Sequence, residues 1–146
     1  MKLIPLSKGK HAIVDDEDFD RISQFKWHYH PYGYAARKPG KVSIYLHHEV
    51  MGKKVRIDHA NGDRLDCRKE NMREATAQQN AANRRPTSKK WRFKGVRMKQ
   101  GTWHAEITYN RKYYFLGAYQ EEADAALAYN VAAQLCFGEF AHLNDV

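Results

Sequence analysis

The sequence lacks the features that secreted, membrane-spanning and zinc-bound proteins need. It has two cysteines in 146 residues, Cys67 and Cys136, and neither belongs to a C-x-x-C pair. We therefore expect neither a disulfide framework nor a structural zinc site, and we expect the protein in a reducing compartment. No apolar run approaches the roughly 20 residues of a membrane-spanning helix, and the N-terminus has no apolar stretch long enough for a secretory signal. We therefore expect a cytoplasmic, intracellular protein that has no membrane partner.

Acidic residues are also few relative to basic ones. The chain has 25 Lys and Arg against 17 Asp and Glu, a net charge of +8. The surplus is uneven: residues 51–90 have eleven basic and five acidic side chains, residues 91–112 have six and one, and residues 113–146 have none and five. A basic block of this kind attracts a phosphate backbone. The alternative is a solvated surface that only keeps the protein soluble.

Short strands separated by turns are predicted for the first half of the chain. Apolar and β-branched runs predict strands over residues 10–14, 34–37, 42–47 and 55–59. An acidic start predicts a short amphipathic helix from Asp15, and Asn61-Gly62 predicts a turn, because both residues tolerate positive φ. A longer helix is expected over residues 69–84. Five aromatic residues could form either a base-stacking platform or a core, and we favour the core: Phe25, Trp27, Tyr29, Tyr32 and Tyr34.

A three-stranded meander followed by a helix is predicted for the second half. The strands are expected near residues 94–98, 103–109 and 112–118, with turns at Gln100-Gly101 and Asn110-Arg111. The helix is expected over residues 121–137, with Gly138 at its end. Its predicted apolar stripe consists of Ala123, Ala126, Leu127, Ala133 and Leu135.

A basic, proline-broken stretch separates the two halves. Pro86 disfavours helix in the residue before it, so the preceding element is expected to end there. We interpret residues 86–91 as a linker. The basic residues in and beside it can lie along a phosphate backbone: Arg84, Arg85, Lys89 and Lys90.

The segment over residues 58–85 holds the residues that could carry chemistry. Asp58 and His59 end a predicted strand, Asn71 lies twelve residues beyond His59, and Asn80 lies twenty-one beyond it. Cleavage of a phosphodiester requires a base that deprotonates water and a cation that neutralises charge on the phosphorane and the leaving oxygen. A neutral imidazole can be that base, and carboxylate and amide oxygens suit Mg²⁺. Turn formation and helix capping by the same residues are the alternative interpretation.

Residues 42–85 resemble the HNH homing endonucleases of phages and group I introns. The matching pieces are Leu46-His47-His48, Val55-x-x-Asp58-His59-x-Asn61-Gly62, Leu65-Asp66-x-Arg68-x-x-Asn71-x-Arg73 and Thr76-x-x-x-Asn80-x-x-Asn83. The resemblance implies the ββα-metal (His-Me finger) fold, in which two short strands and a helix hold one divalent cation. It implies that His59 is the general base, that Asn71 orients its imidazole, and that Asp58 and Asn80 bind the metal.

The resemblance leaves the roles of two further residues open. Asn83 lies one helical turn beyond Asn80 and could replace it as a metal ligand or contact phosphate. His47 either contacts phosphate near the scissile bond or packs within its strand. Because Asn stands where many HNH enzymes place a final His, the resemblance favours Mg²⁺ over zinc, with Mn²⁺ as a substitute.

Residues 92–144 resemble the ethylene-response-factor (Apetala-type) DNA-binding domain. The matching pieces are Phe93-Lys94-Gly95-Val96-Arg97, Trp103-x-Ala105-Glu106-Ile107, Phe115-Leu116-Gly117-x-Tyr119, Ala125-Ala126-x-Ala128-Tyr129-x-x-Ala132-Ala133 and Gly138-x-x-Ala141-x-x-Asn144. That family lays a three-stranded sheet in the major groove, with the helix behind it. By position, the resemblance implies these DNA contacts: Lys94, Arg97, Lys99, Trp103 and Glu106.

The second module also departs from that family. Thr108, Tyr113 and Phe115 stand where the plant proteins have Arg, Arg and Trp, so a different target sequence is expected. Arg97 is the best candidate for base readout, because arginine can grip guanine in a bidentate way. Five residues are interpreted as core instead: Ala105, Leu116, Ala126, Tyr129 and Ala133.

Together these patterns predict an α+β protein with an HNH nuclease domain over residues 1–85, a linker over residues 86–91 and a three-stranded antiparallel sheet packed on one helix over residues 92–146. The expected function is a metal-dependent, site-specific homing endonuclease that acts on double-stranded DNA as a monomer or weak dimer, encoded by a phage or associated with a host nucleoid. Two alternatives stay open. One is a non-catalytic DNA-binding regulator with the HNH segment as a scaffold, and the other is a structural HNH protein of phage packaging.

Overall fold

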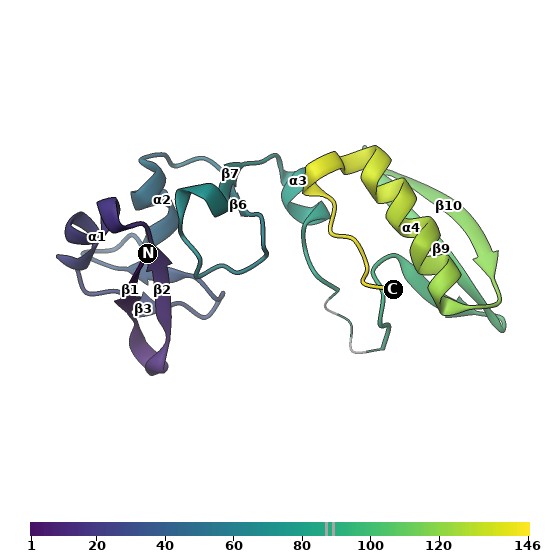
Figure 1. Ribbon diagram of the computed structural model, residues 1–146, viewed down its shortest axis with the longest axis horizontal. Helices are drawn as coiled ribbons and strands as arrows, with labels where there is room; N and C mark the ends of the chain where they lie inside the picture. The colour runs from purple at the N-terminus through teal and green to yellow at the C-terminus, as the bar shows by residue number, and fades with distance from the viewer. Residues whose placement is uncertain (87, 89) are drawn as a thin grey trace. The chain divides into compact units, whose positions relative to one another are not determined.

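The computed structural model describes residues 1–86, 88 and 90–146, which divide into two compact units, Met1–Ala75 and Thr76–Val146. Both units combine small sheets with helices, which are short except for one long helix in the second unit (Figure 1). The division falls earlier in the chain than the predicted domain end at residue 85, so residues 76–85 fold with the second unit. Within the predicted linker, Thr87 and the expected DNA contact Lys89 lie outside the described residues.

Small antiparallel sheets and short helices make up the first unit. Strand β1 (Lys2–Pro5) pairs with β2 (His11–Val14) across the 3-10 turn η1 (Ser7–Gly9). A second sheet has the order β3 (His28–Tyr29), β4 (Ala35–Arg37) and β5 (Ile44–Tyr45). A third sheet pairs β6 (Ile57–His59) with β7 (Met72–Glu74). The helical elements are α1 (Asp16–Ser23), α2 (Leu46–Met51) and the 3-10 turn η2 (Lys69–Asn71).

The core of the first unit lies where these elements meet. Ile4, Ile22 and Leu46 are each at most 1% exposed, and Trp27 donates from Nε1 to the carbonyl oxygen of Ile22 at 2.9 Å. Helix α1 forms where it was predicted, with acidic residues in its first turn, where they complement the helix dipole. The aromatic core prediction is confirmed for Trp27 and wrong for Phe25 and Tyr32, which are exposed.

Two element predictions for this part of the chain are wrong in part. The strand expected over residues 42–47 is confined to β5, and His47 lies on helix α2 instead. The buried residues of α2 recur at helical spacing, and Gly52, at φ 65°, ends the helix in the left-handed region. The helix expected over residues 69–84 gives way to η2 and β7, because Met72–Glu74 pairs with β6.

Helix α3 (Ala77–Ala82) is the part of that expected helix that forms. It begins at a capping box: the Gln79 main-chain N–H donates to the Thr76 hydroxyl, and the Thr76 main-chain N–H donates to Oε1 of Gln79. These bonds satisfy helix N–H groups that would otherwise lack partners. The N-cap of the helix, Thr76, is also the first residue of the second unit.

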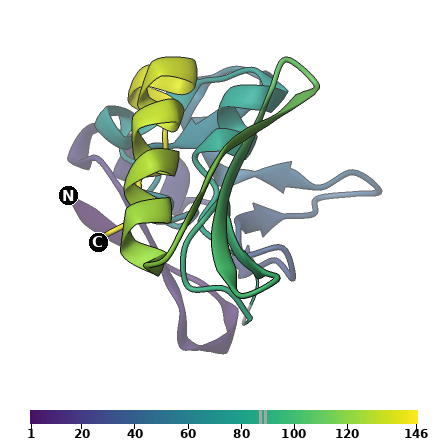
Figure 2. The ribbon, with the colours of Figure 1, turned by 90° about the vertical axis from the view of Figure 1, so that its right-hand side faces the viewer.

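A three-stranded meander and a long helix form the rest of the second unit. Strands β8 (Val96–Lys99), β9 (Thr102–Tyr109) and β10 (Lys112–Tyr119) pair antiparallel in sequence order, close to the three predicted ranges. The connecting turns form at the predicted dipeptides, and Gln100, Gly101, Asn110 and Arg111 have the positive φ that tight hairpins favour. Helix α4 (Glu122–Phe137) runs along one face of the sheet (Figures 1 and 2), and the 3-10 turn η3 (Gly138–Phe140) follows.

Small side chains let α4 lie close to the sheet. Ala126 and Ala133 are fully buried and Tyr129 is 3% exposed, so these core predictions are confirmed. The predicted apolar stripe of this helix is wrong at Ala123, which is exposed, and at Leu127 and Leu135, which are 51% and 83% exposed. The helix thus packs through alanines and Tyr129, and its larger aliphatic residues point outward. None of the helices in the described part of the chain is long and apolar enough to cross a membrane.

Candidate functional site

Two adjacent residues of β6, Asp58 and His59, form the centre of the candidate site. Both are buried, at 3% and 5% exposure, and the register of the sheet places Asp58 opposite Arg73 and His59 opposite Met72. Arg73 donates from Nε to Oδ2 of Asp58 at 2.9 Å, and its Nη2 lies 2.9 Å from the same oxygen. The short β6–β7 ladder therefore holds these two consecutive residues, one with a carboxylate and one with an imidazole, at fixed positions in the sheet.

Asn71 fixes the loop that follows His59. Its Oδ1 accepts from the main-chain N–H of Asn61 at 3.0 Å, and its Nδ2 donates to the carbonyl oxygen of Asp66 at 2.8 Å. The main chain adds bonds from the Ala60 N–H to the Asn71 carbonyl and from the Gly62 N–H to the His59 carbonyl, both 2.8 Å. Asn71 thus acts on the backbone around His59, while the direct orientation of the imidazole by its amide stays a prediction.

A buried carboxylate that the sequence reasoning gave no role closes the same loop. Asp66 is 2% exposed and accepts from the Asn61 Nδ2 at 2.9 Å. It also accepts from Arg68, whose Nε and Nη2 lie 2.8 and 2.7 Å from the two carboxylate oxygens. This bidentate pairing holds the pKa of Asp66 below its usual range. The sequence signal for it was the Asp-x-Arg spacing within the matched motif.

A buried second imidazole lies beside His59. His47 of α2 is 7% exposed, its ring is stacked on Tyr45 with a 5.6 Å centroid separation, and it meets the ring of His59 edge-on at 5.4 Å. The ring of Tyr34 lies against both imidazoles, with its centroid 5.1 Å from that of His47 and 6.1 Å from that of His59. The Nδ1 atom of His47 has no hydrogen-bond partner among the described residues.

Burial sets the protonation of both rings. It lowers the pKa of His47 to about 3, with smaller contributions from His48 and His59. Burial also lowers the pKa of His59, although Asp58, Asp63 and Asp66 oppose this shift. Both imidazoles are therefore neutral at pH 7, the form in which an imidazole can accept a proton.

The expected metal ligands divide between the two units. Asp58 belongs to the first unit, whereas Asn80 lies on α3 and Asn83 follows it in the second. The pairing of either amide with Asp58 therefore stays a prediction. No group of three His, Cys, Asp or Glu side chains within the described ranges is arranged to hold a metal ion. A carboxylate with amide oxygens is a hard donor set, which fits Mg²⁺ rather than zinc.

Residues 49–82 match the HNH endonuclease family. This segment of the chain is therefore similar to the HNH endonucleases. An uncharacterized HNH endonuclease of Acanthamoeba polyphaga mimivirus is 29% identical to it over 152 aligned residues, which cover 99% of this chain and 80% of the relative. No solved structure matches the chain. The HNH segment, residues 49–82, spans β6, the Asn71 loop, β7 and α3.

Beyond the HNH segment, a second group of polar side chains lies on the outer face of the β8–β10 sheet. Arg97 forms an ion pair with Glu106 on the neighbouring strand, and the Tyr113 hydroxyl donates to Oε2 of Glu106 at 2.8 Å. The carboxylate between them raises the pKa of both Arg97 and Tyr113. Phe115, also on this face, is 53% exposed. The sheet thus presents a charged and aromatic surface.

The other predicted DNA contacts have mixed surroundings. Lys99 is exposed, as are Arg84 and Arg85 before the linker and Lys90 within it. Trp103 is half-buried and packs against the core of its unit, with the ring of Trp91 edge-on at 6.2 Å.

The predicted DNA contact Lys94 is partly buried, and its ammonium donates to carbonyl oxygens at the end of α3. Burial and the nearby Arg84 lower the pKa of Lys94 to about 8. These positions give Trp103 a packing role and Lys94 a contact with its own chain.

Proposed function

We propose that this chain is a metal-dependent, site-specific DNA endonuclease of homing type. The observation that carries the proposal is the buried, neutral His59 beside Asp58 on β6, inside the segment that matches the HNH family. A neutral imidazole next to a carboxylate is the pair that metal-assisted phosphodiester hydrolysis needs. The name of the mimivirus relative supports the nuclease class.

In the proposed reaction, His59 accepts a proton from water as the water oxygen attacks phosphorus. The bond from phosphorus to the 3′ oxygen breaks, and that oxygen leaves with its electron pair. Asp58 and Asn80, with Asn83 as the alternative ligand, would hold a Mg²⁺ ion that stabilises the leaving oxygen; Mn²⁺ could replace it. Asn71 holds the loop after His59 through the main chain of Asn61 and Asp66.

The second unit is proposed to bind double-stranded DNA in the manner of an Apetala-type domain. Its support is the exposed Arg97 and Lys99, the aromatic sheet face and the surplus of basic residues over 91–112. Because Glu106 holds Arg97 and Tyr113 in place, the guanidinium would reach a base edge in one fixed orientation. This unit would supply affinity and register, because contacts to phosphate alone carry no sequence information. A monomer or weak dimer is proposed.

One observation favours the alternative of a non-catalytic DNA-binding regulator. The pairing of Arg73 with Asp58 gives the buried carboxylate a cationic partner without any metal. In a non-catalytic scaffold, this ion pair alone would balance the charge of the buried carboxylate. Binding without cleavage would then be the function of the chain.

Supercoiled plasmid carrying candidate target DNA distinguishes the two functions. The wild-type protein should convert it to open-circular or linear form with Mg²⁺ and not with EDTA. His59→Ala should abolish conversion and leave the gel shift of the same DNA unchanged. His11→Ala, at an exposed position of β2, is the control and should cleave normally. Metal-independent binding without any cleavage by the wild-type protein would establish the regulator instead.

A further inference from the structure

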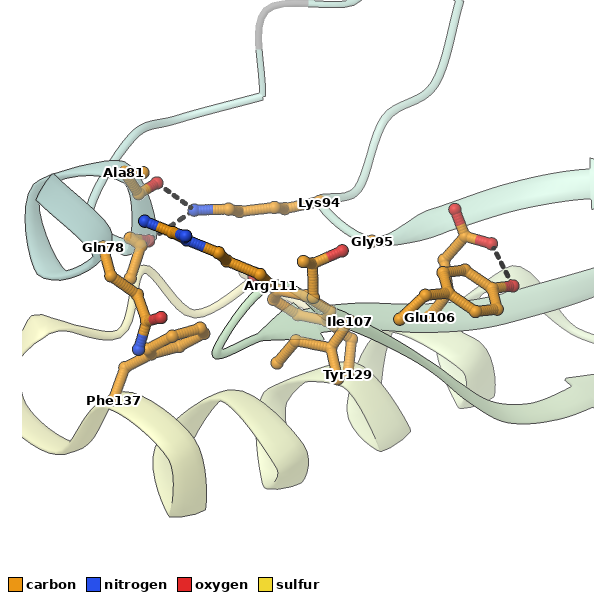
Figure 3. Close-up of a pocket in the computed structure, with 12 residues that line it drawn as sticks. Gln78, Ala81, Lys94, Gly95, Glu106, Ile107, Arg111, Tyr129 and Phe137 are labelled. Atoms are coloured by element: carbon orange, nitrogen blue, oxygen red, sulfur yellow. Dashed lines mark hydrogen bonds between the residues drawn. The ribbon is translucent and has the colours of Figure 1, made fainter.

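Helix α3, which ends the HNH segment, is held at its C-terminal end by a lysine from the other side of the linker. The Nζ atom of Lys94 donates to the carbonyl oxygen of Ala81 at 3.2 Å (Figure 3) and to that of Arg84 at 2.8 Å, and also to that of Ala82. An ammonium group has three N–H donors. They are directed at the carbonyls of the last two residues of α3 and of Arg84 just beyond it, at the end where a helix has few N–H partners of its own, so this ammonium acts as a cap of α3.

The lysine is itself fixed from both sides of its main chain. Its N–H donates to Oδ1 of Asn144 at 2.7 Å, and its carbonyl accepts from Nδ2 of Asn144 at 3.0 Å. Asn144 is in turn bonded to Asn130 of α4 by two further hydrogen bonds, of 2.7 and 2.9 Å. Lys94 is therefore hydrogen-bonded on both sides to the part of the second unit that β8–β10, α4 and the following residues form, here called the sheet unit, and its side chain extends toward α3 (Figure 3).

Two more main-chain donors of the sheet unit reach α3. The N–H of Asn110, in the β9–β10 turn, donates to Oε1 of Gln78 at 3.0 Å. The N–H of His142 donates to the carbonyl oxygen of Ala82 at 3.2 Å. Both ends of the helix are thus attached by hydrogen bonds to the sheet unit.

Packing under α3 is incomplete, so these polar attachments matter more. A cavity of about 460 Å³ lies between α3, the sheet and α4, with Gln78, Lys94, Ile107, Arg111 and Phe137 among its lining residues (Figure 3). Of the residues of α3 itself, Ala82 alone is buried. A six-residue helix with this little apolar burial depends on its end contacts for a defined position.

We infer that Lys94 is a positioning residue for the nuclease, which ties the helix that carries Asn80 to the DNA-binding sheet. The inference rests on the proposed function, in which Asn80 is a metal ligand. It makes the sheet unit part of the catalytic apparatus, since the metal-binding helix takes its position from that unit. It also moves Lys94 out of the set of phosphate contacts, because its three donors are already used.

The test compares Lys94→Met with Lys99→Met, which removes an exposed lysine from the end of β8. Hydrogen exchange of the full-length protein should show α3 amides losing protection about tenfold in Lys94→Met, the loss expected for a charged hydrogen-bond donor. Amides of α4 should keep their protection, which shows that the unit is folded. Lys99→Met should leave the exchange protection of α3 amides unchanged. It should lower the affinity for DNA and make that affinity less dependent on salt concentration.

Activity supplies the second readout. At saturating DNA, Lys94→Met should raise the Mg²⁺ concentration for half-maximal cleavage by about tenfold, with DNA affinity within about twofold of wild type. Gln78→Ala removes the acceptor of the Asn110 N–H at the other end of α3. It should also lower the exchange protection of α3 amides and raise the Mg²⁺ concentration for half-maximal cleavage, each by a smaller factor.

Unchanged α3 exchange and an unchanged Mg²⁺ requirement in Lys94→Met would overturn the inference. A fall in DNA affinity with normal α3 exchange would overturn it as well, and would return Lys94 to the DNA contacts. A wild-type protein that cleaves no DNA overturns the proposed function and, with it, the positioning role. The exchange data then still decide whether Lys94 holds α3, so the two failures are distinguishable.

Discussion

Arg73 on β7 donates from Nε to Oδ2 of Asp58 on β6 at 2.9 Å, and its Nη2 lies at the same distance from that oxygen. The carboxylate proposed as a metal ligand therefore already has a guanidinium against it. A divalent cation and an arginine at the same carboxylate repel each other. The affinity of the proposed site for Mg²⁺ is thus set partly by Arg73.

Arg73→Met should lower the Mg²⁺ concentration for half-maximal cleavage several-fold, because it removes the competing positive charge. The same change should reduce the free energy of unfolding by about 3 kcal/mol, since it leaves a buried carboxylate with one partner fewer. Metal titrations of cleavage and urea denaturation measure the two effects. Arg56→Met, an equal charge change at an exposed position next to β6, is the control and should change neither quantity much. A higher Mg²⁺ requirement in Arg73→Met would show that Arg73 assists the site.

Asn71→Ala should lower the free energy of unfolding by about 2 kcal/mol, because it removes an acceptor for the Asn61 N–H and a donor to the Asp66 carbonyl. Asn71→Asp keeps the acceptor but turns a carboxylate oxygen toward the Asp66 carbonyl, so it should be the less stable of the two variants at pH 7.5. Chemical denaturation at pH 7.5 and pH 5 tests this order. Equal stability of Asn71→Asp and wild type would contradict the bonding assigned to the amide.

His47 should make the stability of the protein fall in mild acid. Its pKa is lowered from 6.5 to about 3 by burial, so below pH 6.5 the unfolded chain takes up a proton that the folded chain refuses. The free energy of unfolding therefore falls by up to about 1.4 kcal/mol per pH unit in that range. From pH 7 to pH 5, wild type should lose about 2 kcal/mol more than His47→Phe. Tyr45→Phe, which keeps the stacked ring, should retain the wild-type slope; a matching slope in His47→Phe would exclude this histidine as the cause.

Gly95→Ala should destabilise the second unit by more than about 3 kcal/mol. The residue has φ +71°, and a Cβ there would overlap Cδ2 of Tyr129 and lie 2.6 Å from the carbonyl oxygen of Glu106. Gly101→Ala is the matched comparison, because Gly101 has φ +79° and open space around it. It should cost about 1 kcal/mol, the conformational part alone. Thermal unfolding of the two variants separates the steric effect from the backbone effect, and equal losses would refute the close packing of Tyr129.

The sequence predicted the second unit better than the first, for local reasons. Tight turns such as Asn110-Arg111 have a chemical signature that short-range reasoning can use, and the strands on either side follow from them. Helix α2 was missed because Leu46 and His47 end the run that predicted a strand, and only the burial of Leu46, His47 and Val50 shows the helical repeat. The strand β7 was missed because its formation depends on pairing with β6, a contact between residues distant in sequence.

The candidate site was predictable to the extent that its residues are consecutive in one motif. Asp58 and His59 end a strand, as expected, and Asn71 lies in the same loop network. The roles of Arg73 and Lys94 were not predictable, because a charged side chain gives no local signal of the carboxylate or carbonyls it will meet after folding. The ring cluster around His47 likewise depends on contacts between separate elements.

The contact between Lys94 and the end of α3 has a consequence for chimeric proteins. A graft that exchanges the C-terminal module at the basic linker leaves α3 with its original N-terminal half and removes the lysine that caps it. A graft joined before Thr76 transfers the helix together with its cap. Modules of this kind should therefore be interchangeable, in the laboratory or between genomes, only when the crossover falls ahead of the helix.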